Sequence, residues 1–245
     1  MKVLLLAAGL GARLRPITDT IPKCLVPIHE TPLLQIWLAR VFHAGLSGAV
    51  VNLHYLPDPV KALVAESPWR DQITYFDEPT LLGTAGTLSA TRHLLGEGPV
   101  MVVHADNLSA INLVRFQAAH SARPPGCIMT MALFDTDSPQ TCGIVELDSQ
   151  ARVTAMHEKD PNPPGTLANA AVYIIEPELF DLMEVQDPPA TDISTDVIPQ
   201  VMGRIYSYKI EGYHRDIGSP QALAQAHQDL GPDHIAALMA PNERP

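Results

Sequence analysis

The stretch VLLLAAGLGARLRPITDTIPKCLVPI, residues 3–28, decides the fold of this chain. Its first residues, Val3–Ala8, are continuously apolar and predict a buried first strand. Gly9 and Gly11 follow at once, and glycines let a backbone turn tightly and point N–H groups at an anion. Because ligands bind at the carboxyl ends of strands in an open α/β sheet, this loop predicts a phosphate-binding site.

Positive charge gathers around this loop, although the protein as a whole is acidic. The first 25 residues hold four cations and one acid, a local charge of +3 in a chain whose net charge is −11. Arg13 can hold a phosphate with its planar fork, and Lys23 adds a mobile point charge. The negative net charge of the chain argues against a nucleic-acid partner, whereas the local cations favour a small polyanion as ligand.

Composition and cysteine usage limit the class of protein. With 46% apolar and 18% charged residues, the 245-residue chain is typical of a globular protein with a substantial core. No apolar run approaches the roughly 18 residues that span a bilayer, so no membrane partner is expected. Cys24, Cys127 and Cys142 lack the spacing of a metal or redox site, which predicts buried thiols and a cytoplasmic location.

The first 135 residues alternate strands with helices, which indicates a parallel sheet covered on both faces. The predicted strands are Val3–Ala8, Ala49–Leu53, Ile73–Phe76, Val100–His104 and Ile128–Phe134. The predicted helices are Ala85–Leu95, Ile111–His120 and a helix whose apolar stripe runs from Leu33 to Val41, with Thr31 as N-cap and Pro32 as first residue. The pattern is that of a Rossmann-like, doubly wound α/β fold.

Beyond residue 135 the pattern changes to hairpins and longer connections. The predicted strands are Gly143–Leu147, Arg152–His157, Ala170–Ile175 and Arg204–Ile210, and the predicted helices are Asp192–Met202 and Ser219–Leu230. We therefore expect a mixed sheet with a smaller β subregion in a single domain, 1–240. Its halves would be residues 1–135 and 136–230, followed by a tail, 241–245.

A dinucleotide-binding turn is an alternative interpretation of Gly9 and Gly11, and it would make the protein a nicotinamide-dependent oxidoreductase. The third glycine of that fingerprint would fall at Leu14. Pro16 and Pro22 would also interrupt the helix that should receive the pyrophosphate. A glycine turn with surface arginines is the remaining alternative.

The full spacing resembles the signature loop of the nucleotide-sugar pyrophosphorylases, the sugar-1-phosphate nucleotidyltransferases. The matching positions are Gly9, Gly11, Arg13, Pro16, Thr18, Pro22 and Lys23. The resemblance implies a nucleotide-diphospho-sugar transferase fold in which Leu6, Ala8, Gly9 and Gly11 bind the nucleotide. It also implies that Arg13 and Lys23 are catalytic and neutralise charge on the phosphates. Cys24 departs from the family, where many members have proline.

Two downstream segments extend the resemblance towards a base and a metal. Glu78-Pro79 and Leu82–Thr87 resemble the base-recognition segment of guanylyltransferases that make GDP-mannose, which implies nucleotide contacts from Leu82, Gly83, Thr84 and Gly86. A plain helix start with a threonine cap remains the alternative there. By resemblance, Asp106 also contacts the nucleotide, and Asp106 and Asp216 hold Mg²⁺. Ala105 and Ser219 replace the family's usual glycine and threonine beside them.

The segment between these aspartates is similar to the family's sugar-phosphate site, which makes 136–230 the sugar-phosphate-binding half and its β subregion sugar-binding. The resemblance implies that Glu158 accepts sugar hydroxyls, that Lys159 pairs with the phosphate, and that Gly143 and Asn169 line the pocket. Thr141-Cys142 stands where relatives often have an aromatic residue.

The reaction implied joins a nucleoside triphosphate to a sugar 1-phosphate and gives an NDP-sugar and pyrophosphate. GTP and a mannose- or manno-heptose-type sugar are favoured, while thymidylyl, uridylyl or cytidylyl transfer stays open. A non-catalytic nucleotide-sugar-binding regulatory subunit is a further alternative. The sequence leaves the oligomeric state open.

Overall fold

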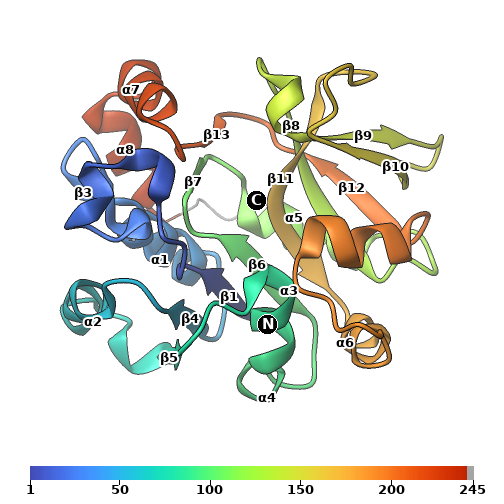
Figure 1. The fold of residues 1–245 in the computed structure, drawn as a ribbon, viewed down its shortest axis with the longest axis horizontal. Coiled ribbons are helices and arrows are strands. Elements are labelled where there is room, and N and C mark those ends of the chain that lie inside the picture. Colours follow the sequence, from blue (N-terminus) through green and yellow to red (C-terminus); the bar gives the residue numbers. More distant parts are fainter. Residues whose placement is uncertain (242–245) are drawn as a thin grey trace. The chain divides into compact units, whose positions relative to one another are not determined.

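The computed structural model describes residues 1–241, so most of the expected tail, residues 242–245, lies outside the described residues. The chain divides into two compact units. Unit 1 consists of Met1–Leu81, His104–Val114 and Gly212–Pro245, and unit 2 of Leu82–Val103 and Arg115–Glu211. Both mix helices and strands, and the α/β class expected from the sequence is confirmed (Figure 1).

Unit 1 contains a three-stranded parallel sheet. Its strands are β1 (Lys2–Leu6), β4 (Ala49–Leu53) and β5 (Ile73–Asp77), with Ala49 paired to Val3 on one side and to Ile73 on the other. Two short antiparallel pairs complete its strands: β2 (Pro27–Ile28) with β3 (Thr31–Pro32), and β7 (Asn107–Ser109) with β13 (His214–Asp216).

The helices of unit 1 form a core that anchors the first loop. They are α1 (Leu33–His43), α2 (Pro57–Ala65), α7 (Pro220–Asp229) and α8 (Pro232–Met239). Unit 1 also contains 3-10 turns at Ala12–Leu14, Ile17–Asp19, Lys23–Leu25 and Arg70–Gln72. Leu14 and Val26 of the loop are buried in one cluster with Leu33 and Ile36 of α1 and Leu223 of α7. Burying such side chains stabilises the fold by about 1.5–3 kcal/mol each, so the loop is held by its apolar residues.

Unit 2 is built around one long strand. This strand, β11 (Leu167–Ile175), pairs antiparallel with β6 (Val100–His104), β8 (Met129–Asp135) and β9 (Gly143–Leu147). β10 (Val153–Glu158) forms a hairpin with β9, and β12 (Ile205–Lys209) runs parallel to β8. The helices are α3 (Gly83–Ala90), α4 (Arg92–Leu95), α5 (Leu113–Ser121) and α6 (Pro177–Glu184), with a 3-10 turn at Pro139–Thr141.

Three predicted helices differ from the structure. Ala85–Leu95 is two helices, because the hydroxyl of Thr91 donates to backbone carbonyls of the preceding turn at the break. Asp192–Met202 forms a π-helical turn, Ile193–Val197, and a 3-10 turn, Ile198–Val201, where Pro199 supplies no backbone N–H. Thr31 is a strand residue, and Pro32 occupies the N-cap position of α1.

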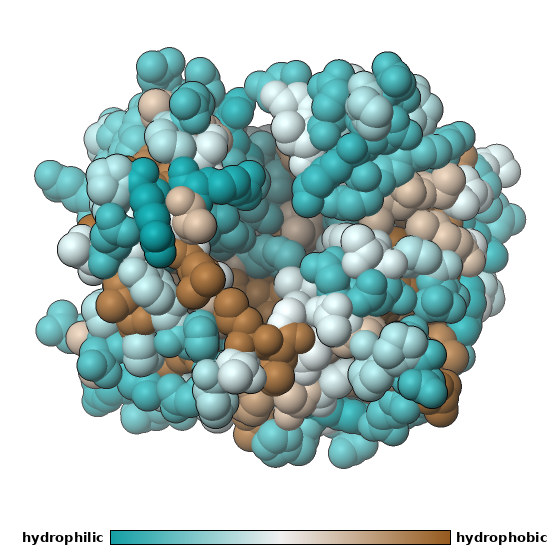
Figure 2. Space-filling model, viewed as in Figure 1, coloured by the Kyte–Doolittle hydropathy of each residue, from teal (hydrophilic) through white to brown (hydrophobic). Residues whose placement is uncertain are grey.

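Helices α2, α6 and α8 were not predicted from the sequence. All three are short, with eight or nine residues, and each begins with proline. No helix among residues 1–241 combines the length and the apolar character that a membrane span requires. Figure 2 shows one face of the molecule, on which hydrophilic residues predominate.

Acid should destabilise unit 2 through His120, which is buried against Thr130 and Glu176. Burial, together with the nearby guanidinium of Arg123, lowers the pKa of His120 to about 4. An unfolded histidine titrates at about 6.5, so the unfolded chain takes up this proton first and stability falls as the pH drops from about 6.5 towards about 4.

Urea unfolding of the wild type and His120→Gln at about pH 7.5 and about pH 5 measures this contribution. The midpoint of the wild type should fall further on acidification than that of the variant. An equal fall in both proteins would contradict the prediction, because the many carboxylates of the chain act equally on each.

Candidate active site

The first loop is locked by a glycine and a threonine seven residues apart. Gly11 has a left-handed backbone with φ of 63°, and a Cβ there would lie 2.7 Å from the methyl group of Thr18. The hydroxyl of Thr18 donates to the carbonyl oxygen of Gly11 at 2.7 Å. A Cβ at Gly9 would meet no atom within 4 Å, so Gly9 leaves open space above the loop. Leu6 and Ala8, just before it, are nearly buried.

A buried polar pair holds the start of this loop. The side-chain oxygen of Asn52 accepts from the backbone N–H of Ala7 at 2.6 Å, and its amide nitrogen donates to Glu78 at 2.8 Å. Both side chains are only 4% exposed. Sequence reasoning missed Asn52, although a lone asparagine inside the apolar run of β4 is a signal for a buried hydrogen bond.

Four charged residues of unit 1 converge beside the loop. Lys23, only 8% exposed, forms an ion pair with Asp106, and its Nζ lies 3.4 Å from Oδ1 of Asp216. Arg13, which is mostly exposed, places Nη2 3.4 Å from Oδ2 of the same Asp216. The pairing of β7 with β13 causes this convergence, because Asn107, next to Asp106, lies opposite Asp216.

The charges in this cluster stabilise one another. Burial raises the pKa of Asp106, but the ammonium of Lys23, with a smaller contribution from His104, outweighs it, so the pKa lies below the usual value. Gly218 makes room for the cluster. A Cβ there would lie 2.6 Å from Arg13, 2.8 Å from Asp216 and 2.9 Å from Lys23.

The departures from the expected signature have local explanations. Cys24 is 1% exposed, and burial, with the nearby Asp106 carboxylate, raises the pKa of its thiol to about 12, so it stays a packed thiol. The hydroxyl of Ser219 accepts from the backbone of Ala222 and caps α7, a role that threonine can also perform. Ala105 is fully buried, and its N–H donates to the carbonyl oxygen of Leu6.

This donor set fits a magnesium ion. Asp106 and Asp216 converge on the same ammonium, so one small cation can be within reach of both carboxylates. Residues 1–241 contain no group of three histidine, cysteine or acidic side chains that could hold a metal. Two carboxylates with the remaining positions left to water and phosphate is the coordination that Mg²⁺ favours.

The base-recognition candidates lie at the start of α3 in unit 2. Gly83 has a φ of 76°, and a Cβ there would lie 2.2 Å from the carbonyl oxygen of Thr191. Leu82 is 36% exposed, Gly86 is partly buried, and the hydroxyl of Thr84 contacts Asp192 at 3.2 Å. The start of α3 therefore packs against Thr191 and Asp192.

The sugar-phosphate candidates occupy three adjacent strands of unit 2. Gly143 on β9 lies opposite Glu158 on β10, and a Cβ at Gly143 would lie 2.6 Å from Oε2 of Glu158. Lys159 follows, with Nζ 3.4 Å from Oε1 of Glu158 and a side chain that is 70% exposed. The amide nitrogen of Asn169 on β11 lies 4.0 Å from the sulfur of Met156, and a Cβ at Gly143 would lie 3.2 Å from the same sulfur.

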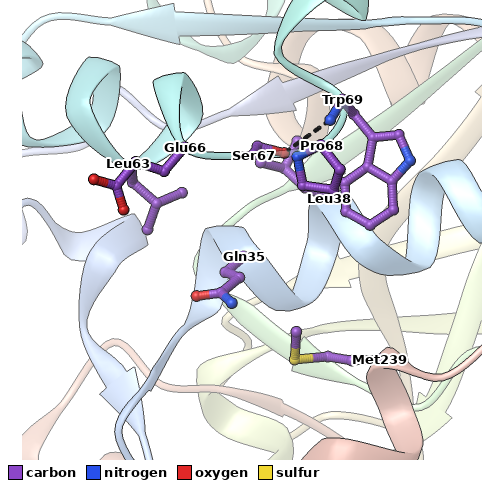
Figure 3. A pocket seen from close by; sticks show the side chains of 8 residues that line it. All are labelled: Gln35, Leu38, Leu63, Glu66, Ser67, Pro68, Trp69 and Met239. Carbon is purple, nitrogen blue, oxygen red and sulfur yellow. Dashed lines mark hydrogen bonds between the residues drawn. The ribbon is translucent and has the colours of Figure 1, made fainter.

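Figure 3 shows a pocket of unit 1 whose lining includes none of these candidates. Its volume is about 430 Å³, and its lining is Gln35, Leu38, Leu63, Glu66, Ser67, Pro68, Trp69 and Met239. Trp69 stacks on Phe42 with ring centroids 5.3 Å apart. Its only charged lining residue is an acid, Glu66, so this pocket lacks the cations that a triphosphate needs.

Residues 2–232 match the model of a family described as nucleotidyl transferase. The chain belongs to this nucleotidyl transferase family. The family expected from the sequence is thereby confirmed.

Two curated relatives of this family show the level of similarity. The low-salt glycan biosynthesis nucleotidyltransferase Agl11 of Haloferax volcanii is 31% identical, over 93% of this chain and 65% of its own length. The mannose-1-phosphate guanylyltransferase of Mycobacterium tuberculosis is 30% identical, over 92% of this chain and 63% of its own. The chain thus spans just under two thirds of the length of these relatives.

Solved structures show the same fold. An apo UDP-glucose pyrophosphorylase superposes with a TM-score of 0.79 at 20% identity, covering 93% of this chain and 97% of that one. A Bacillus anthracis protein described as a glucose-1-phosphate thymidylyltransferase gives the same TM-score at 19% identity, covering 93% and 94%. The fold class expected from the sequence is confirmed.

Proposed function

We propose that this protein joins a nucleoside triphosphate to a sugar 1-phosphate and releases pyrophosphate. The convergence of Lys23, Arg13, Asp106 and Asp216 beside the first loop carries the proposal. Such a cluster suits two polyanionic substrates, because cations and a carboxylate-held metal offset the repulsion between them. Cys24 and Cys127 are buried as predicted, whereas Cys142 is only partly buried and departs from that prediction. All three are free thiols, which supports a cytoplasmic location.

The proposed reaction is an in-line displacement at the α-phosphorus. An oxygen of the sugar phosphate forms the new P–O bond, the bond to the β-phosphate oxygen breaks, and that electron pair leaves with pyrophosphate. The attacking oxygen is already anionic at neutral pH, so no general base is required and positioning dominates. Arg13 and Lys23 bind phosphate oxygens, and the backbone N–H groups of Gly9 and Gly11 orient the phosphates.

Asp106 and Asp216 would hold Mg²⁺, which supplies charge neutralisation on the phosphates when bound. In unit 2, Glu158 accepts hydrogen bonds from sugar hydroxyls, and Gly143 and Asn169 line the same surface. Lys159, whose side chain is exposed, pairs with the sugar phosphate. Gly83 and Gly86 with their neighbours Leu82 and Thr84 contact the base.

We favour GTP and a mannose-type sugar 1-phosphate as substrates. The segment Leu82–Thr87 and the mannose-1-phosphate guanylyltransferase relatives at about 30% identity support this choice. Uridylyl or thymidylyl transfer is the second candidate, and the structural neighbours that carry those names favour it through the shared fold.

A pyrophosphate-release screen tests the function. Five triphosphates with guanine, adenine, uracil, thymine or cytosine bases are crossed with mannose, manno-heptose, glucose and glucosamine 1-phosphates in the presence of Mg²⁺. Release with one pair and not with the others identifies the substrates. No release with any pair, together with measurable binding of a nucleotide sugar by calorimetry, would overturn the enzyme and favour a regulatory binder.

Gly143→Ala should raise the KM for the sugar 1-phosphate about tenfold, because the added Cβ displaces the Glu158 carboxylate that would accept sugar hydroxyls. The KM for the triphosphate should change little. Gly165→Ala is the matched control, since a Cβ there meets no atom within 4 Å. Equal kinetics in both variants would contradict the assignment of Gly143.

A further inference from the structure

The segment Thr191–Asp196 of unit 2 lies against the proposed base-recognition turn. The carbonyl oxygen of Thr191 accepts from the backbone N–H of Ala85 at 3.0 Å. The same oxygen is so close to Gly83 that a Cβ there would lie 2.2 Å from it. The backbone of the turn therefore rests directly on this segment, which we call the 191–196 turn.

The side-chain hydroxyl of Thr84 forms two hydrogen bonds with the 191–196 turn. Its hydroxyl donates to Oδ2 of Asp192 at 3.2 Å and accepts from the backbone N–H of Ile193 at 2.8 Å. A hydroxyl that donates one hydrogen bond and accepts another is held in one rotamer. The side chain of Thr84 is thus placed to fix the turn.

The 191–196 turn is rigid by its own hydrogen bonds. Oδ1 of Asp192 accepts from the backbone N–H of Ser194 at 2.8 Å and caps the π-helical turn. Oδ2 of Asp196 accepts from the backbone N–H groups of Asp192 and Thr191 at 2.9 and 2.8 Å. These donors hold the pKa of Asp196 well below its usual range, so it remains a charged acceptor.

The far side of the turn reaches the proposed sugar-binding strand. Ser194 forms a side-chain hydrogen bond with Tyr173 of β11, whose ring is fully buried. The phenol oxygen of Tyr173 in turn accepts from the amide of Asn169 at 2.8 Å. Asn169 also accepts from the N–H of Ala171, which adopts a left-handed φ of 52° where the register of β11 shifts. Asn169 is therefore held from two directions.

We propose that the 191–196 turn is a positioning element that couples the base-recognition turn to the sugar-binding strand. Thr84 connects it to the first, and Tyr173 to the second. Resting on the proposed function, this assigns the side chains of Thr84 and Asp192 to positioning, so that Thr84 contacts the base through its backbone alone. A shift of the turn moves both binding surfaces together, so the affinities for the two substrates are linked.

Amide hydrogen exchange of the free protein tests the coupling without any assumption about activity. Thr84→Val removes the hydroxyl and keeps the shape of the side chain. It should raise exchange about tenfold in residues 83–90 and also in residues 167–175 on β11. Unchanged protection in 167–175 would overturn the proposal. Thr154→Val, which removes an exposed hydroxyl of β10, is the control.

Steady-state kinetics supply the second readout. Thr84→Val should raise the KM for both substrates about tenfold with kcat within about threefold of the wild type, and Thr84→Ser should restore both values. A rise confined to the triphosphate would overturn the coupling. If the wild type releases no pyrophosphate, the proposed function fails while the exchange experiment still decides the coupling.

Discussion

Lys23→Ala should lower kcat/KM for pyrophosphate release about 1,000-fold. Lys23 is the buried cation of the site and contacts both Asp106 and Asp216. Its loss leaves two carboxylates facing the incoming phosphates without their shared ammonium. Removing one preorganised charge donor from an active site costs about 100- to 1,000-fold, and here the added repulsion places the effect at the upper end.

Lys61→Ala is the control for this experiment. Lys61 also pairs with an aspartate of unit 1, Asp77, at 2.9 Å, but on an exposed surface. The control should keep the activity of the wild type, and circular dichroism should show that both variants are folded. A folded Lys23→Ala protein with activity within about threefold of the wild type would contradict the proposed chemistry.

The first loop shows how much the sequence alone could predict. The spacing of Gly11 and Thr18 is a local property, and the structure explains it by a left-handed backbone and one hydrogen bond within eight residues. Strand β1 was equally predictable, because all of its residues after Lys2 are apolar. Contacts between residues that are close in sequence can therefore be predicted from the sequence pattern.

The convergence of Asp106 with Asp216 leaves no such pattern. The two lie about 110 residues apart, and the strands that join them, β7 and β13, have three residues each, too few to show an alternation. Only the resemblance to the family paired them. Asn52 and Asp192 were missed for a related reason: their partners, Ala7 and Thr84, lie far away in sequence. Buried polar contacts of this kind are fixed by tertiary packing.

Asp106→Asn should lower kcat/KM about 100- to 1,000-fold and should also raise the Mg²⁺ concentration that gives half-maximal activity. Asparagine keeps the size of the side chain and removes the charge, so the variant separates electrostatics from packing. A role of Asp106 in holding the metal predicts both changes. A role confined to orienting Lys23 predicts a loss of rate with the magnesium requirement unchanged.

Asp77→Asn is the matched control, because Asp77 is another aspartate of unit 1 that pairs with a lysine. It should leave both the rate and the magnesium requirement unchanged. Wild-type activity and magnesium dependence in a folded Asp106→Asn protein would refute the metal assignment. Asp216 is more exposed than Asp106 and is also bound by Arg13. Asp216→Asn should therefore raise the Mg²⁺ concentration for half-maximal activity less than Asp106→Asn does. The size of the effect would then follow the burial of the two carboxylates.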